Sequence, residues 1–493
     1  MNNSTLWLKG IKNKALPSLK KDIDTDILII GGGITGITTA FYLKNEKLDI
    51  TLIDSNKIGY GVTARTTGKL TYLQENVLNK IKNVYNTDIA IKYINSQKYA
   101  MDLVKNNIIT HNIKCNFESN SSYVFTNQEN NIYQIKEIEK ILSYANINHK
   151  VSTTLPIKYP CKYAVKIIDS AVFHPVKYVL ALKEVCLENG IHLYENTRAI
   201  DIKQLDDEYI VTTSNNIIKA KKVVLACHYP FKVTQGFIPF KTYIEKSYVV
   251  SGVTNKNKMF NAISYSDTHS IRYHSDSKDY IIYAGLSNTL SNNVDNEKNY
   301  NELLWHMKSN LCTDIKYYWF NQDIITADGL PLIGYVEKDN PNLLMGTGYN
   351  TWGMTNGTLA GKILSDLIKG KNNKYLELVE PNRPFNISKL VNLVGSNFDN
   401  GISYIASKIK KDYSFYKSNV KTIVKDGVKY GVYTDDDGKE HIVHNLCPHM
   451  KCNLIFNEVD KTWDCPCHSS RFTIDGKVIK GPSTYDISVK QDL

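Results

Sequence analysis

Ile27-Leu-Ile-Ile-Gly-Gly-Gly-Ile-Thr-Gly36 is the stretch of sequence that decides the fold. Its first four residues form a continuous apolar run, which is typical of a strand buried on both faces of a parallel sheet. Gly31 allows a tight turn after that strand, Gly33 lets a diphosphate approach the backbone, and Gly36 permits close helix–strand packing. The N-terminus of the following helix offers free N–H groups to the phosphates. The stretch therefore predicts a dinucleotide site.

The residues after this turn continue the same pattern. Helical periodicity over 34–44 is followed by a second apolar strand over 50–53, which ends at Asp54. An acidic side chain at this strand tip can bind both ribose hydroxyls of an adenosine half. This combination of strand, turn, helix and acid argues against a glycine turn that binds no ligand. The motif does not separate FAD from NAD.

Length and composition bound the class of protein. A chain of 493 residues predicts about three structural units, and 42% hydrophobic with 22% charged residues is a globular balance. The net charge of +11 comes from scattered lysines without a basic stripe, so we expect no nucleic-acid partner. No targeting segment is visible, and no apolar run approaches the roughly 20 residues of a membrane span. We therefore expect a cytoplasmic protein without a membrane span.

The remaining sequence predicts alternating elements. We expect helices over 178–189 and 357–368, and strands over 209–213, 222–226 and 343–348. Residues 371–418 predict a connector with some helix around 402–410. Short strands with turn signals follow from residue 419 to the end, which predicts a separate C-terminal unit.

Two short segments near the C-terminus combine cysteine and histidine. Cys447-Pro-His449 and Cys465-Pro-Cys-His468 each offer one thiolate and one imidazole. On this spacing alone two sites remain open. One is a four-coordinate structural zinc, and the other is a [2Fe–2S] cluster with two cysteines on one iron and two histidines on the other.

The surrounding residues favour the cluster. Together with Trp463, Gly476 and Gly481-Pro-Ser483, these segments resemble the Rieske domain of cytochrome bc complexes through residues 419–490. The resemblance implies that Cys447 and Cys465 bind the inner iron, that His449 and His468 bind the solvent-facing iron, that Cys452 and Cys467 form a disulfide, and that Gly481-Pro482 covers the cluster.

The segment also departs from that family. Lys451 and Ser469 stand where the family often has glycine, and Phe472 replaces a tyrosine whose hydroxyl bonds a cysteine sulfur in high-potential members. Ser470, the other hydroxyl directed at sulfur, is kept. Fewer donors to the cluster predict a lower reduction potential.

Three segments with the glycine turn carry a second resemblance. Residues 58–70, Asp328-Gly-Leu-Pro-Leu-Ile-Gly334 and 346–355 make residues 20–370 similar to the D-amino-acid-oxidase/glycine-oxidase superfamily of FAD flavoproteins. This resemblance implies noncovalent FAD as the default, with Asp54 in place of the usual Glu and Thr63 in place of a common Ser. The residues expected to contact FAD are Gly31, Gly33, Gly36, Asp54, Thr63, Thr67, Lys69, Gly348, Gly353, Met354 and Thr355.

The resemblances imply a fold and a domain order. We expect an α/β FAD-binding domain of the Rossmann-like, glutathione-reductase type, with nucleotide-binding parts at about 20–75, 160–230 and 325–370. The intervening segments would form an α+β substrate domain, 371–418 a connector, and 419–493 a small all-β Rieske domain. We also expect a fragment ending near residue 410 to bind FAD without the Rieske domain.

The whole chain looks like bacterial FAD-dependent oxidoreductases with a C-terminal Rieske domain. That resemblance implies oxidation of a small amine or amino acid, with electrons leaving the flavin through the cluster to an unidentified acceptor. The catalytic residues are not assigned. Arg272 could clamp a substrate carboxylate through its bidentate guanidinium, or be a structural arginine.

Two alternatives remain. The chain could be a redox sensor or electron-transfer flavoprotein without turnover. Asp267, His269 and His274 could instead form the iron site of a Rieske oxygenase. However, residues 270–283 predict hairpin strands, in which His269 and His274 would face opposite sides.

Overall fold

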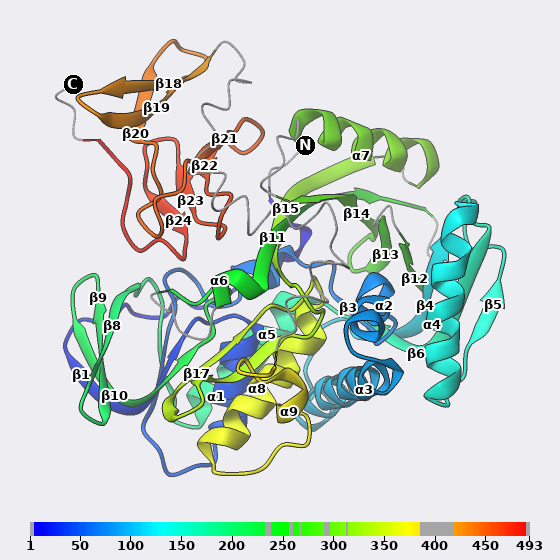
Figure 1. The fold of residues 1–493 in the computed structure, drawn as a ribbon, viewed down its shortest axis with the longest axis horizontal. Coiled ribbons are helices and arrows are strands. Elements are labelled where there is room, and N and C mark those ends of the chain that lie inside the picture. The colour runs from blue at the N-terminus through cyan, green and yellow to red at the C-terminus, as the bar shows by residue number, and fades with distance from the viewer. Residues whose placement is uncertain are drawn as a thin grey trace.

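A computed structural model describes residues 4–231, 238–255, 260–265, 269–289, 296–311, 314–384 and 419–489 (Figure 1). Two large sheets with their helices form the body of the molecule, and residues 419–489 form a separate unit of short strands, coloured orange to red, packed on that body. None of the helices in these ranges is long and apolar enough to cross a membrane.

The first sheet is a parallel layer with antiparallel additions. Its central order is β17-β10-β1-β2-β7, with β16 beside β17, while β9 pairs with β10 and β8. Ile27 and Ile29 belong to one apolar cluster and Leu28 and Ile30 to another, as expected for a strand buried on both faces. The strands are β1 (Ile23–Ile30), β2 (Ile50–Ile53), β7 (His192–Tyr194), β8 (Ala199–Leu205), β9 (Glu208–Thr213), β10 (Ile217–Leu225), β16 (Leu332–Glu337) and β17 (Asn340–Thr347).

Helices pack on this layer around α1. Helix α1 contacts both α5 and α8, and α8 contacts α3 in turn. Gly361 makes the α1–α8 approach possible, because a Cβ there would lie 2.5 Å from Thr38 Cβ. The expected helices and strands of this layer are confirmed, with ends shifted by a few residues. The helices are α1 (Ile34–Leu43), α3 (Thr87–Thr110), α5 (Pro175–Glu188) and α8 (Gly353–Ile368).

The second sheet is mixed and forms the α+β layer. Its order is β15-β11-β14-β13-β12-β4-β6-β3, with β5 beside β6, and β12 runs parallel to β4. Its strands are β3 (Lys69–Leu70), β4 (Glu118–Thr126), β5 (Lys150–Ser152), β6 (Tyr163–Val172), β11 (Thr242–Val253), β12 (Phe260–Ser264), β13 (Ser270–Ser275), β14 (Asp279–Thr289) and β15 (Asp314–Thr326). The neighbouring helices are α2 (Glu75–Val84), α4 (Ile132–Tyr144), α6 (Ile238–Lys241) and α7 (Asn296–Asn310), with 3₁₀ turns η1 (Leu6–Leu8), η2 (Val62–Arg65) and η3 (Glu129–Asn131).

The C-terminal unit consists of two small antiparallel sheets. Their orders are β18-β19-β20 and β21-β22-β23-β24. Trp463 is fully buried beneath Gly431, where a Cβ would lie 2.4 Å from the indole ring. The strands are β18 (Val420–Lys425), β19 (Val428–Thr434), β20 (Glu440–His444), β21 (Ile455–Asn457), β22 (Thr462–Asp464), β23 (Arg471–Thr473) and β24 (Val478–Lys480).

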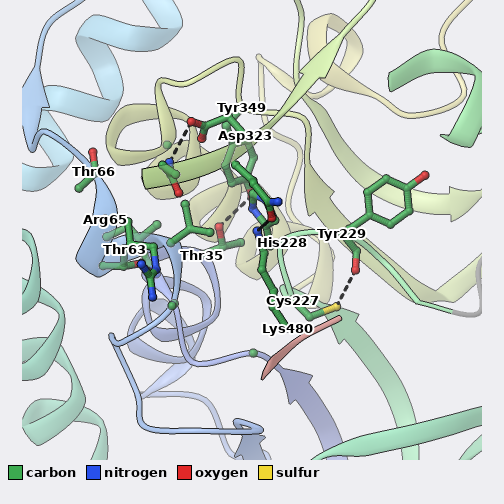
Figure 2. Close-up of a pocket in the computed structure, with 18 of the residues that line it drawn as sticks. Thr35, Thr63, Arg65, Thr66, Cys227, His228, Tyr229, Asp323, Tyr349 and Lys480 are labelled. Carbon is green, nitrogen blue, oxygen red and sulfur yellow. Dashed lines mark hydrogen bonds between the residues drawn. The ribbon is translucent and has the colours of Figure 1, made fainter. Parts of the chain in front are cut away.

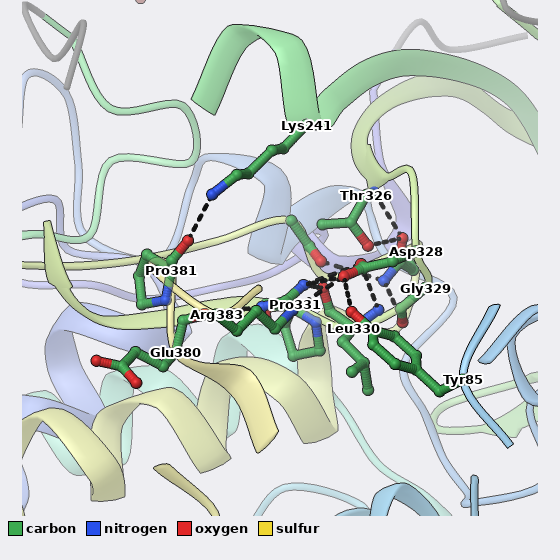
Figure 3. Close-up of polar contacts among 12 residues, drawn as sticks. Tyr85, Lys241, Thr326, Asp328, Gly329, Leu330, Pro331, Glu380, Pro381 and Arg383 are labelled. Carbon is green, nitrogen blue, oxygen red and sulfur yellow. Dashed lines mark hydrogen bonds and ion pairs between the residues drawn. The ribbon is translucent and has the colours of Figure 1, made fainter. Parts of the chain in front are cut away.

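A buried ion pair fixes the start of the expected connector to the body (Figure 3). The Arg383 guanidinium donates to both carboxylate oxygens of Asp328 at 2.7–2.9 Å and to the carbonyl of Leu330. Asp328 also accepts from the Tyr85 hydroxyl at 2.8 Å. Helix α9 (Leu376–Val379) lies in the same segment. Arg383 therefore ties this part of the expected connector to the body. The helix expected around 402–410 lies outside the described residues.

Candidate functional site

The glycine turn between β1 and α1 has the geometry that the motif predicted. Gly31 has φ +112°, and a Cβ there would lie 2.5 Å from the carbonyl oxygen of Ala226. A Cβ on Gly36 would lie 1.9 Å from the carbonyl oxygen of Gly31. Larger side chains at either position would force the turn apart, so both glycines are required by its backbone.

Asp54 lies at the end of β2 beside this turn. Its carboxylate accepts from the amides of Gly32 and Asn56, both at 2.7 Å. Burial raises the pKa of Asp54, and these two hydrogen bonds oppose the rise. The carboxylate therefore faces the turn in the position expected for a ribose-binding acid.

A cavity of about 360 Å³ begins at the turn and extends to the second sheet (Figure 2). Eight of the eleven residues expected to contact FAD line it: Gly31, Gly33, Asp54, Thr63, Thr67, Lys69, Gly353 and Met354. Gly36, Gly348 and Thr355 do not. Gly36 packs beneath the turn, Gly348 packs beside Thr326, and the Thr355 hydroxyl donates to the carbonyl of Trp352.

Ionisable side chains from the second sheet and from helix α2 also line the cavity. Lys69 Nζ donates to the Ala262 carbonyl at 2.9 Å and to Ser270 Oγ at 2.6 Å, and burial lowers the pKa of Lys69 to about 7. Burial also raises the pKa of Glu75 and of Asp323, each to about 7. Carboxyls and amines shifted toward neutral pH are typical of functional sites.

Arg272 is placed away from this cavity. It is fully buried and does not line the cavity wall. Its guanidinium donates to the backbone carbonyls of Thr67 and Phe173 and lies 4.8 Å from the Trp7 ring. These contacts favour the structural alternative for Arg272.

The two cysteine–histidine loops of the C-terminal unit lie together. The Cys465 thiol contacts that of Cys447, which lowers the pKa of Cys447 to about 7. The rings of His449 and His468 are 4.9 Å apart at 89°. His468 Nδ1 is buried and makes no hydrogen bond within the described ranges. Two adjacent thiols and an imidazole nitrogen left open for coordination form a donor set that fits a metal cluster.

A third and a fourth cysteine lie beside the proposed ligands. Cys452, Cys465 and Cys467 have their sulfur atoms within 4.8 Å of one another. Cys452 and Cys467 are joined by a disulfide and so are not ligands.

Two residues that replace glycines of the Rieske pattern have a left-handed backbone conformation. Lys451 and Ser469, which stand at family glycine positions, have φ of 58° and 68°. Both loops therefore retain left-handed turns that glycine would adopt more easily. Ser470 Oγ accepts from the amide of Ser483 at 2.9 Å and contacts the Cys447 sulfur.

Comparison with known proteins identifies both parts of the chain. The family model for FAD dependent oxidoreductases matches residues 26–367, and the model for the Rieske [2Fe-2S] domain matches residues 407–490. The chain belongs to the FAD-dependent oxidoreductase family and carries a C-terminal Rieske domain. It is an FAD and [2Fe–2S] protein, and its expected fold class is confirmed.

Relatives share one or both parts. A Rieske 2Fe-2S iron-sulfur protein of Bacillus subtilis, YhfW, is 30% identical over 97% of this chain and 96% of its own length. Gamma-glutamylputrescine oxidoreductase of Escherichia coli is 20% identical over 76% of this chain and 91% of its own. The structure of glycine oxidase from Geobacillus kaustophilus has a TM-score of 0.62, 16% identity, and covers 74% of this chain and all of that one.

The Rieske domain docks over the cavity. Residues 479–484 and Arg471 line it beside the glycine turn. Arg471 lies 4.1 Å from the Phe320 ring, and Arg198 Nη2 donates to the Val478 carbonyl at 3.5 Å. The cavity therefore has walls from both domains.

Tyr229 covers one histidine of the Rieske domain, His468, whereas His449 is partly exposed. His468 is 5% exposed because the Tyr229 ring lies 5.0 Å from its imidazole, and the same ring lies 6.2 Å from that of His449. Tyr229 and His228 also line the cavity (Figure 2). His228 has φ 70°, a strained conformation for a non-glycine residue.

Sequence reasoning did not assign a role to His228 or Tyr229. Both follow β10, at the carboxyl end of a central parallel strand, where ligands bind in open α/β sheets. Their position after this strand was the one sequence signal that they could line a ligand site.

The candidate oxygenase site is not assembled. His269 lies beside Tyr283 and His306, whereas His274 lies beside Trp7 and His174. Strands β13 and β14 form the expected hairpin, so the two histidines lie in different clusters. Asp267 lies outside the described residues.

Proposed function

We propose that the chain oxidises a small amine or amino-acid-like substrate at FAD and passes the electrons through the Rieske cluster to an external acceptor. The observation that carries this proposal is the position of Tyr229, whose ring borders the cavity and packs on His468. Bound FAD takes two electrons from a C–H bond, and a Rieske cluster carries one electron at a time. A side chain shared by both sites supports a relay between them.

The proposed cofactor ligands follow from the geometry above. The residues proposed to bind FAD noncovalently are Gly31, Gly33, Asp54, Thr63, Thr67, Lys69, Gly353 and Met354, with Gly36, Gly348 and Thr355 shaping the backbone around them. Cys447, His449, Cys465 and His468 are proposed to bind the cluster. A cytoplasmic location also remains a proposal.

The acidic wall of the cavity supports an amine substrate. Glu245 and Asp323, from β11 and β15, both line it. Burial raises the pKa of each carboxyl, that of Asp323 to about 7. An ammonium group beside them would stabilise their ionised forms. In its absence, a carboxyl with a pKa near 7 can hold or accept a proton at neutral pH.

The names of similar proteins support the same substrate class. One is named for gamma-glutamylputrescine, which carries an amine, and another for glycine, an amino acid.

Anaerobic mixing with a panel of amines and amino acids tests this function. We expect a substrate to bleach the flavin absorbance and then to produce the EPR signal of a reduced Rieske cluster. Bleaching without cluster reduction would contradict the relay. No bleaching by any member of the panel would favour a redox sensor without turnover.

A further inference from the structure

Lys480 is a residue of the Rieske domain whose side chain enters the FAD cavity of the other domain (Figure 2). It is the last residue of β24 and pairs in register with Arg471 of β23. Its Nζ donates to Gln322 Oε1 of β15 at 3.3 Å. In the described ranges it forms no ion pair with a carboxylate. The ammonium therefore lacks a close counter-charge.

Other cations surround this ammonium. Burial and Arg471 lower the pKa of Lys480 to about 7, Asp323 and Asp464 oppose them, and Arg65 lowers it further. Arg471 has its own partners, since it donates to Asp464 at 3.0 Å and contacts Asp460 at 3.4 Å. Asp323 acts on Lys480 and Asp460 acts on Arg65, but within the described ranges neither cation forms an ion pair with a carboxylate. Both cations can therefore pair with a ligand of the cavity.

Arg65 indicates which anion would balance them. It lies in η2 and lines the cavity, and burial together with Arg471 lowers its pKa. Two residues earlier, Thr63 Oγ1 accepts from the Ile34 amide at the N-terminus of α1, at 3.1 Å. That N-terminus is where the glycine turn holds a dinucleotide diphosphate. A diphosphate carries two negative charges and can pair with both Lys480 and Arg65.

We propose that Lys480 of the Rieske domain, together with Arg65, binds the diphosphate of FAD, so that the cofactor is held across the domain interface. FAD binding and docking of the Rieske domain are then linked, and each stabilises the other. The proposal rests on the FAD site and does not depend on substrate or turnover. It also predicts that a fragment ending near residue 410 binds FAD more weakly than the whole chain.

The test uses full-length protein stripped of FAD, with affinities for FAD measured by quenching of flavin fluorescence. Lys480→Met keeps the length of the side chain and removes its charge. We expect it to weaken FAD binding about tenfold or more, as for loss of one charge-assisted hydrogen bond. Lys480→Arg should restore most of the affinity. Lys477→Met is the matched control, because Lys477 lies on the same hairpin, is 68% exposed and pairs with Asp486.

Two smaller probes show whether the diphosphate is the group contacted. Lys480→Met should weaken competition by ADP and leave that by adenosine unchanged, with the EPR signal of the cluster intact. Wild-type FAD affinity in Lys480→Met, or equal weakening for ADP and adenosine, would overturn the proposal. Because no substrate is present, failure of the amine oxidase function would leave this result untouched.

Discussion

The ring of Tyr229 lies 5.0 Å, centroid to centroid, from the imidazole of His468. Tyr229 belongs to the oxidoreductase domain and His468 to the Rieske domain, and Tyr229 also borders the FAD cavity. His468 therefore faces a wall of the cavity that is proposed to hold FAD.

Replacing Tyr229 tests the contact itself. Tyr229→Leu removes the ring that touches His468, so we expect slower electron transfer from photoreduced flavin to the cluster. Tyr229→Phe keeps the ring and should retain most of the rate. Flash photoreduction with detection of cluster absorbance measures the step without substrate. Equal rates in the Leu variant and wild type would show that the ring is not part of the electron path.

The ligand assignment predicts one FAD and two irons per chain. His449→Cys should abolish the Rieske-type EPR signal, because it removes one of the four proposed ligands, beside His468. Flavin should remain bound, because His449 does not line the cavity. Iron, zinc and flavin analysis of purified protein provides the check. Zinc in place of iron, or a Rieske signal that survives the substitution, would refute the assignment.

The hydroxyls near the cluster predict its potential. Ser470 Oγ accepts from the Ser483 amide, which leaves its proton available for the Cys447 sulfur. Ser470→Ala should therefore lower the midpoint potential, and Phe472→Tyr should raise it, each by tens of millivolts up to about a hundred. Protein-film voltammetry gives the values. No rise for Phe472→Tyr with an intact EPR signal would mean that Phe472 is not aligned as the resemblance implies.

The buried Asp328–Arg383 pair predicts a stability effect. Arg383→Met leaves the Asp328 carboxylate, 1% exposed, with its cation removed, so we expect a loss of about 3 kcal/mol in unfolding free energy. The double variant with Asp328→Asn should lose much less, because no uncompensated charge remains. Denaturant unfolding of wild type, both single variants and the double variant measures the coupling. Equal losses in Arg383→Met and the double variant would contradict this account.

The sequence predicted what local backbone rules determine. Gly31 and Gly36 lie where no Cβ fits, and Asp54 comes directly after β2. The spacing of these residues was therefore enough to predict the glycine turn and its acidic side chain. The two cysteine–histidine loops were readable for the same reason. Lys451 and Ser469 show that left-handed turns persist even where glycine is replaced.

The sequence did not predict what domain docking determines. Lys480 and Tyr229 are separated by about half the chain, and neither belongs to a motif that names its partner. Arg272 illustrates the same limit, since its guanidinium fork left a carboxylate clamp and a structural role both open. In the fold that guanidinium donates to backbone carbonyls. Long-range contacts of this kind follow only from the assembled fold.

The central claim is that electrons pass from flavin to cluster within one chain. Its most direct test is anaerobic rapid-freeze EPR after mixing the oxidised holoprotein with an amine or amino acid that bleaches its flavin. We predict that the reduced Rieske signal follows flavin reduction with a rate constant independent of protein concentration. A cluster that stays oxidised beside reduced flavin, or a rate proportional to protein concentration, would contradict the relay.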